Sequence, residues 1–237
     1  DPQLTMTQPA GVTAAAGMDI LCHALESYTA KPYTEFAAKR AEERVPYCGA
    51  NPISDMWSRE AVRLLATSFR TAVADGDDVD ARGAMALAAT FAGMGFGNAG
   101  VHIPHANAYP IAGQVREYHA PGYPGSEPLV PHGMSVALTA PAAFEFTFAA
   151  APERHLRAAA LLTASEVRDG DARTLPDALA SLGDWLDSHP ADARAVITKA
   201  TQAARARKAA RHARELTRKN ALNTMGMPGK LSDCRST

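Results

Sequence analysis

The spacing of apolar residues is the feature that most constrains the fold of this chain of 237 residues. Apolar side chains recur at helical rather than alternating intervals in most segments, and alanine, the strongest helix former, dominates the composition. We therefore predict a mainly α protein, a helical bundle with few or no strands. The predicted helices are Ala14 to Thr29, Asp55 to Ala74, Asp80 to Met94, a short helix from His105, Met134 to Phe148, Pro152 to Ser165 and Leu175 to Asp187.

Two stretches and the end of the chain depart from this helical pattern. Lys31 to Ser54 and Tyr118 to Pro131 are rich in proline or glycine and are predicted to be long loops, which often carry function. From Arg194 to Lys219 the chain holds many lysines and arginines but only one acid, Glu215, and its apolar positions are mostly alanine. We predict a helical domain over residues 1–190 and a basic tail over residues 191–237.

Composition excludes several functional classes. A hydrophobic fraction of 46% argues against a disordered chain, and a formal net charge of -1 argues against a dedicated nucleic-acid binder. No apolar run reaches the ~20 residues that a membrane helix requires. The three cysteines, Cys22, Cys48 and Cys234, are too few and too scattered for a disulfide framework. We expect reduced thiols and a soluble, cytoplasmic protein.

An acid and a histidine stand four residues apart in the first predicted helix. At this spacing the carboxylate of Asp19 and the imidazole of His23 lie on one helix face, within reach of one metal ion. Such a pair also arises by chance, and a hydrogen-bonded surface pair is the alternative. Cys22 points away from His23 on the same helix and is predicted to be a packed thiol.

Later histidines extend this pattern, because they lie in turns marked by glycine and proline. His102 and His105 follow a glycine-rich segment, and His132 follows Pro131. Each turn places an imidazole near a predicted helix start. Three histidines and one carboxylate form a mixed nitrogen and oxygen set that suits Fe²⁺ or Zn²⁺. The alternative is that these histidines are unrelated loop residues.

Three segments carry a resemblance to a known family: Gly17 to Tyr28, Gly95 to Gly113 and Pro131 to Leu138. In order and separation they resemble the metal-binding half of the iron-containing, or group III, alcohol dehydrogenases, over roughly Asp1 to Leu179. The resemblance implies that the metal ligands are Asp19, His23, His105 and His132. His102 is then a neighbour of the site rather than a ligand.

A finer resemblance points to one branch of that family. The segments Tyr47 to Asp55, Gly95 to His102 and Pro128 to Gly133 are similar to the hydroxyacid-oxoacid transhydrogenases, which pass hydride between 4-hydroxybutyrate and 2-oxoglutarate. Position 109 is a tyrosine where many alcohol-oxidising relatives have a second histidine that relays a proton. The resemblance therefore implies that Tyr109, His102 or water performs this relay.

The resemblance also implies a cofactor and a second domain. The ion would act as a Lewis acid on a small hydroxy acid or alcohol, and hydride would pass to NAD(P). No GxGxxG turn follows a strand in this sequence, and the family's dinucleotide-binding α/β domain precedes its helical half. We expect that domain to be absent here, which would expose an apolar wall and favour a homo-oligomer or pairing with a separate cofactor-domain polypeptide.

Two other functional classes remain open from the residues alone. A metal-dependent hydrolase would need a general base, for which Glu26 is the obvious candidate. Glu26 could also accept a hydrogen bond from His23, although an exposed glutamate is the commoner outcome. An inactive fragment could act as a binding module through its basic tail. His155 is predicted to lie on the surface at a helix start, between solvated arginines.

Overall fold

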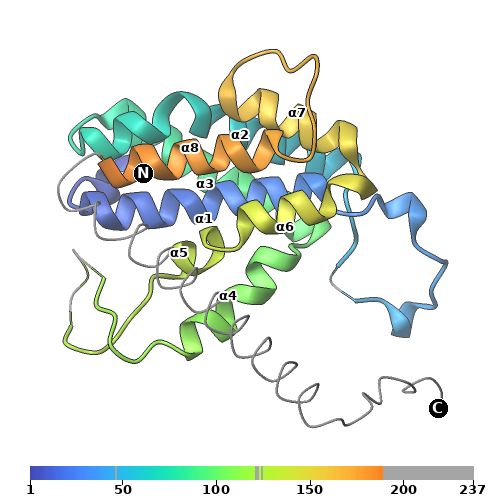
Figure 1. Cartoon of the computed structure of the whole chain (residues 1–237), viewed down its shortest axis with the longest axis horizontal. Helices are drawn as coiled ribbons and strands as arrows, with labels where there is room; N and C mark the ends of the chain where they lie inside the picture. The colour runs from blue at the N-terminus through green and yellow to red at the C-terminus, as the bar shows by residue number, and fades with distance from the viewer. Residues whose placement is uncertain (46, 121–122, 124, 189–237) are drawn as a thin grey trace, which may run out of the picture. The chain divides into compact units, whose positions relative to one another are not determined.

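The computed structural model describes residues 1–45, 47–120, 123 and 125–188, which form helices and connecting loops (Figure 1). Within these residues there is no strand, and only two isolated β-bridges occur, Pro32 with Ala50 and His119 with Leu129. The mainly α prediction is confirmed. The α-helices are α1 (Ala10–Thr29), α2 (Pro52–Ala74), α3 (Val79–Ala99), α4 (Ile103–Gly113), α5 (His132–Ala137), α6 (Ala140–Thr147), α7 (Pro152–Thr163) and α8 (Thr174–Ser188). Short 3-10 helices are η1 (Pro2–Thr5), η2 (Tyr33–Glu35), η3 (Ala41–Glu43) and η4 (Phe148–Ala150).

Helix α1 lies at the centre of the core. It packs against α2, α3, α5 and α7, and in Figure 1 it runs through the middle of the helices. Leu21, Cys22 and Leu25 are fully buried, so the predicted packing of the Cys22 thiol is confirmed. A Cβ at Gly17 would collide with the ring of Phe69, and the glycine therefore allows α2 to approach closely. A helix that is apolar around most of its circumference must be buried in this way.

Helix boundaries differ from the predicted ones where proline and glycine act. The predicted helix from Met134 to Phe148 is two helices, α5 and α6, separated by Leu138 and Thr139. Pro141 explains the break, because its ring nitrogen cannot donate to a carbonyl one turn earlier and its ring disfavours a continuous helix there. Helix α3 continues five residues past Met94 and ends where Gly100 adopts a φ of 100°.

The long segment between α1 and α2 is ordered against the end of α3. The backbone N–H groups of Cys48 and Gly49 both donate to the carbonyl of Ala99, at 3.1 and 2.8 Å. The side chain of Asn51 caps α2 and donates to the carbonyl of Asn98 at 2.8 Å. The segment therefore holds the turn between α3 and α4 in place, and that turn leads directly into the histidines of α4.

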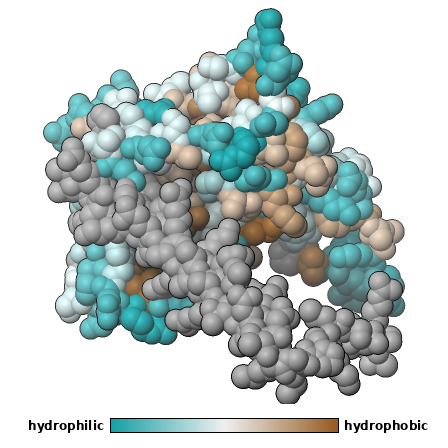
Figure 2. Space-filling view, viewed as in Figure 1, coloured by the Kyte–Doolittle hydropathy of each residue, from teal (hydrophilic) through white to brown (hydrophobic). Residues whose placement is uncertain are grey.

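Several large apolar side chains remain exposed in the described part of the chain. Figure 2 shows hydrophobic patches between hydrophilic side chains on the face in view. The exposed group includes Leu4, Tyr33, Ile53, Met56, Leu87, Tyr109 and Phe146. Among the described residues no single helix is long and apolar enough to cross a membrane; α3 and α4 reach that composition only together, across a bend of 106°. The predicted division at residue 190 falls within 189–237, outside the described residues.

The structure overturns the surface placement predicted for His155. This histidine is 1% exposed and lies between the rings of Phe144 and Phe148. Its Nδ1–H donates to the carbonyl of Ala151 at 2.8 Å, and the hydroxyl of Thr147 lies 3.0 Å from its Nε2. Both ring nitrogens are therefore satisfied in the neutral form.

Of the two neighbouring arginines, Arg157 is exposed as predicted. Arg154 is half-buried, donates to the carbonyl of Tyr28 at 2.6 Å and pairs with Asp55. The helix that carries them, α7, packs against α2, α8 and α1, and this packing buries His155.

Acidification should destabilise the fold through His155. Burial lowers the pKa of His155 below its usual value, so the unfolded chain takes up a proton that the folded chain resists. Its contribution to stability is complete above the ordinary histidine pKa and is lost as the pH falls below it. We expect the free energy of unfolding to decrease between pH 7 and pH 5, measured by urea denaturation, and to decrease less in His155→Gln. Equal pH slopes for the two proteins would contradict this assignment.

Candidate metal centre

The first part of the site comes from two consecutive turns of α1. The side chains of Asp19 and His23 are 24% and 18% exposed, and Nδ1 of His23 lies 3.6 Å from Oδ2 of Asp19. They share one face of the helix, as their spacing predicts. Since α1 is held on several sides by other helices, the backbone that carries this pair is fixed by the core.

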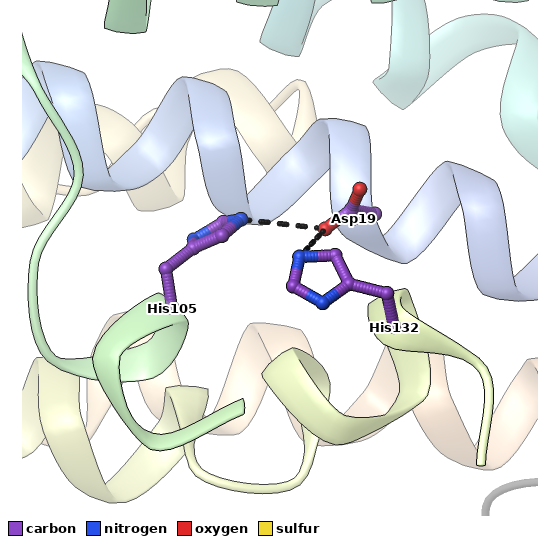
Figure 3. Close-up of side chains that lie close together, drawn as sticks. All are labelled: Asp19, His105 and His132. Carbon is purple, nitrogen blue, oxygen red and sulfur yellow. Dashed lines mark ion pairs between the residues drawn. The ribbon is translucent and has the colours of Figure 1, made fainter. Parts of the chain in front are cut away.

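Two histidines from other helices approach the same carboxylate. His105 lies in the first turn of α4 and is 4% exposed, and its Nε2 is 3.3 Å from Oδ1 of Asp19. His132 is the first residue of α5, and its Nε2 is 3.7 Å from the same oxygen. Figure 3 shows both imidazoles directed at this oxygen atom. One ligand atom from each of the three residues lies within 4.8 Å of the other two.

His23 lies beside this group of three. Its ring stacks on Phe96 of α3 at 4.4 Å between centroids, and it faces the ring of His105 at 4.0 Å. The centroids of the His105 and His132 rings lie 5.5 Å apart. The four residues that the resemblance implies as ligands are thus gathered in one place, with His23 and His132 at the two ends of a row of three imidazole rings.

Two buried atoms of the proposed ligands have no hydrogen-bond partner. They are Oδ1 of Asp19 and Nε2 of His105, which face each other without the alignment of a hydrogen bond. Buried polar atoms are rarely left without a partner in folded proteins. A carboxylate oxygen and imidazole nitrogens form a donor set that fits Fe²⁺ or Zn²⁺. The residues present therefore fit a divalent transition metal.

The charges of the site follow from burial and from the paired carboxylates. Burial favours the neutral form of His105, yet Asp19 and Glu26 together raise its pKa to about 9. Burial lowers the pKa of His23. For Asp19, burial raises the pKa but the surrounding imidazoles outweigh this effect and lower it. At neutral pH the Asp19 carboxylate is ionised and His23 is neutral, the forms that bind metals, whereas His105 must release a proton first.

A fifth residue, Glu26, completes the inner side of the site. It is fully buried, with Oε1 2.6 Å from Nδ1 of His105 and Oε2 accepting the backbone N–H of His102 at 2.7 Å. The sequence predicts that Glu26 accepts from His23 or lies in solvent. Both predictions are wrong, because Glu26 is buried and its partners are His105 and His102. One sequence feature could have predicted this placement. Glu26 lies seven residues, or two helical turns, after Asp19, and this spacing puts both carboxylates on one face of α1.

The two predicted proton-relay residues occupy different environments. Tyr109 is 71% exposed, and its ring lies 5.6 Å from that of His132, one turn of α4 beyond His105. The ring of His102 is turned toward Thr29, 3.2 Å from its hydroxyl, and its edge packs on Phe144. Burial lowers the pKa of His102. Tyr109 therefore stands on the open side of the site, and His102 on the inner side.

Close contact between α5 and α1 brings His132 into the site. Gly133, the residue after His132, packs directly on α1. A Cβ there would fall on the carbonyl oxygen of Ala15 and lie 2.8 Å from the Cβ of Asp19. Only a residue without a side chain allows this approach. The glycine thus sets the distance between the His132 imidazole and the Asp19 carboxylate.

Known proteins share both the sequence and the fold of this chain. The C-terminal domain of the Fe-containing alcohol dehydrogenase family matches residues 13–227. The mitochondrial hydroxyacid-oxoacid transhydrogenase of Xenopus laevis is 50% identical over 190 residues, which are 78% of this chain and 40% of that protein. The chain thus spans about two fifths of the length of this curated relative.

Solved structures agree with the sequence comparison. A 1,3-propanediol oxidoreductase superposes with a TM-score of 0.61 at 32% identity, over 78% of this chain and 41% of that one. An alcohol dehydrogenase from Oenococcus oeni superposes with a TM-score of 0.59 at 30% identity, over 78% of this chain and 40% of that one. The resemblance inferred from the three sequence segments is confirmed.

Two glycine substitutions should have opposite effects on stability. Gly133→Ala forces α5 away from α1, and overpacking of this kind costs about 1–3 kcal/mol. Gly93→Ala, in the interior of α3, meets no atom within 4 Å and should stabilise by about 0.5–1 kcal/mol through helix propensity. Urea denaturation of both variants measures the difference. Equal free energies of unfolding for the two variants would argue against the close packing of α5 on α1.

Proposed function

This chain belongs to the Fe-containing alcohol dehydrogenase family, and on that premise we propose that it is the metal-binding half of an oxidoreductase. It would take part in hydride transfer between a nicotinamide cofactor and a small hydroxy acid or alcohol. The observation that supports this proposal most strongly is the convergence of His105 and His132 on one oxygen of Asp19. Residues from three helices meet there, and two of their buried atoms lack partners.

The substrate class follows from the likeness to the transhydrogenases. Half of the aligned residues are shared with an enzyme named for hydroxy acids and oxo acids. We propose the pair 4-hydroxybutyrate and 2-oxoglutarate, with a simple alcohol as the alternative. NAD(P) would be bound by another part of the protein or by a separate polypeptide, because the described residues contain no strand from which a dinucleotide-binding sheet could be built.

The residues of this chain would divide the work between holding an ion and moving a proton. Asp19, His23, His105 and His132 would hold the metal, which supplies Lewis acidity toward a substrate oxygen. The Tyr109 hydroxyl, exposed beside His132, would give or take the proton of the substrate hydroxyl. His102 is the alternative relay group, and its ring would pass a proton toward Thr29 on the inner side.

A metal-dependent hydrolase is the less well supported function for the same site. It requires a base that can take a proton from water next to the ion. Glu26 has both oxygens engaged, one with the His105 ring and one with the His102 amide, and it is fully buried. It is therefore poorly placed for this task. The proposed binding role of the basic tail concerns residues outside the described ones.

Metal content tests the proposal directly. We expect the purified full chain, after incubation with Fe²⁺ or Zn²⁺ and removal of the excess, to retain about one ion per chain by elemental analysis. His105→Ala and His132→Ala should lose it, because each removes a nitrogen ligand. His119→Ala is the matched control, since this exposed histidine lies outside the site and should leave the metal content unchanged. Equal retention in all four proteins would refute the site.

Tyr109→Phe tests the proton relay. The substitution keeps the ring beside His132 and removes the hydroxyl. NADH formation from 4-hydroxybutyrate, assayed with the metal-loaded chain combined with a dinucleotide-binding polypeptide, should therefore fall roughly 10²–10⁴-fold. The metal content should not change, because the phenol is not a proposed ligand. His102→Gln serves as the comparison. A large loss in His102→Gln together with a normal rate in Tyr109→Phe would assign the relay to His102 instead.

A further inference from the structure

The buried carboxylate of Glu26, on α1, is hydrogen-bonded to residues outside its own helix. It is 0% exposed, although a buried ionised carboxylate is costly unless donors surround it. Its two partners both belong to the beginning of α4, namely the Nδ1 of His105 and the backbone N–H of His102, the residue that precedes the helix. A negative charge at this helix end is also favoured by the helix dipole. Glu26 thus connects α1 to the start of α4.

These contacts determine which ring nitrogen of His105 faces Asp19. An ionised carboxylate can only accept hydrogen bonds, so Nδ1 of His105 carries the hydrogen that points to Glu26. Nε2 is then directed at Oδ1 of Asp19, 3.3 Å away. The imidazole therefore lies between two carboxylates of a single helix, hydrogen-bonded to Glu26 and directed at Asp19. Because Asp19 and Glu26 lie two turns apart on α1, the rigid helix sets the distance between these two contacts.

We propose that Glu26 is a positioning residue that fixes the tautomer and the orientation of the His105 ring, so that Nε2 is presented to a metal ion. The inference rests on the proposed metal site. Without this acceptor, Nδ1 of a nearly buried ring would have no partner, and the ring would be free to turn toward other groups. Hydrogen bonding of the second ring nitrogen is the general means by which proteins orient metal-binding histidines.

The decisive experiment uses Zn²⁺ as the probe and the full chain as the protein. The dissociation constant for Zn²⁺, measured by competition with a chromophoric chelator, should rise roughly 10–100-fold in Glu26→Gln. The glutamine has the same shape, but its single oxygen cannot accept from both donors. Glu26→Asp keeps the charge with a shorter reach, and it should give a smaller loss than Glu26→Gln.

Ser27→Ala is the matched control for a loss of buried polar contacts. Ser27 is the next residue of α1, is fully buried and bonds to Ser58 at 2.6 Å rather than to a histidine. The Ser27→Ala substitution should lower the free energy of unfolding and leave the Zn²⁺ affinity unchanged. An unchanged affinity in both Glu26 variants, with the affinity lost in His105→Ala, would show that Glu26 is only a packing residue and would overturn the proposal.

A second measurement separates this proposal from the metal site itself. Nitrogen-15 chemical shifts of the His105 imidazole, recorded for the metal-free chain above about pH 10, where the ring is neutral, report which ring nitrogen carries the hydrogen. We expect Nδ1 to be hydrogen-bonded in the wild-type chain and this signature to be lost in Glu26→Gln. If the wild-type chain and His105→Ala bind Zn²⁺ equally poorly, the proposed metal site is refuted. The chemical shifts would still show whether Glu26 orients the His105 ring. Identical shifts in wild type and Glu26→Gln would overturn it.

Discussion

Burial of α1 among other helices is the constraint on which the site depends. The same helix fills the core with Leu21 and Leu25 and carries Asp19, His23 and Glu26. Its polar residues cannot move without disturbing the packing of the apolar ones. The packing of the core therefore fixes the positions of these three polar side chains relative to one another. Metal and catalytic sites built on such rigid elements hold their geometry better than sites built on loops.

The site balances acids against imidazoles in a small volume. Two carboxylates, Asp19 and Glu26, flank the ring of His105, and this pairing is the reason for its high pKa. His23 lies one ring away but is kept neutral by burial against Phe96. Neighbouring histidines therefore differ in charge because their surroundings differ. A divalent ion in place of the His105 proton would add positive charge where two carboxylates already lie.

Local patterns made a large part of this arrangement predictable from the sequence. The helical spacing of apolar residues indicates the helices, and the interval between Asp19 and His23 indicates their shared face. Distances between His105, His132 and Asp19 could not be derived in this way, because they depend on how α4 and α5 dock on α1. The resemblance to a family supplied that information. The break between α5 and α6 was missed although Pro141 marks it.

Unequal exposure of His105 and His132 has a kinetic consequence for the proposed site. His105 is 4% exposed and braced by Glu26, whereas the His132 side chain is 42% exposed and begins a helix of only six residues. If the proposed site holds an ion, His132 would be the ligand that solvent reaches first. Exchange with the surrounding solution would therefore be governed by the lifetime of the contact between α5 and α1 at Gly133. The buried half of the site could remain intact while ions come and go.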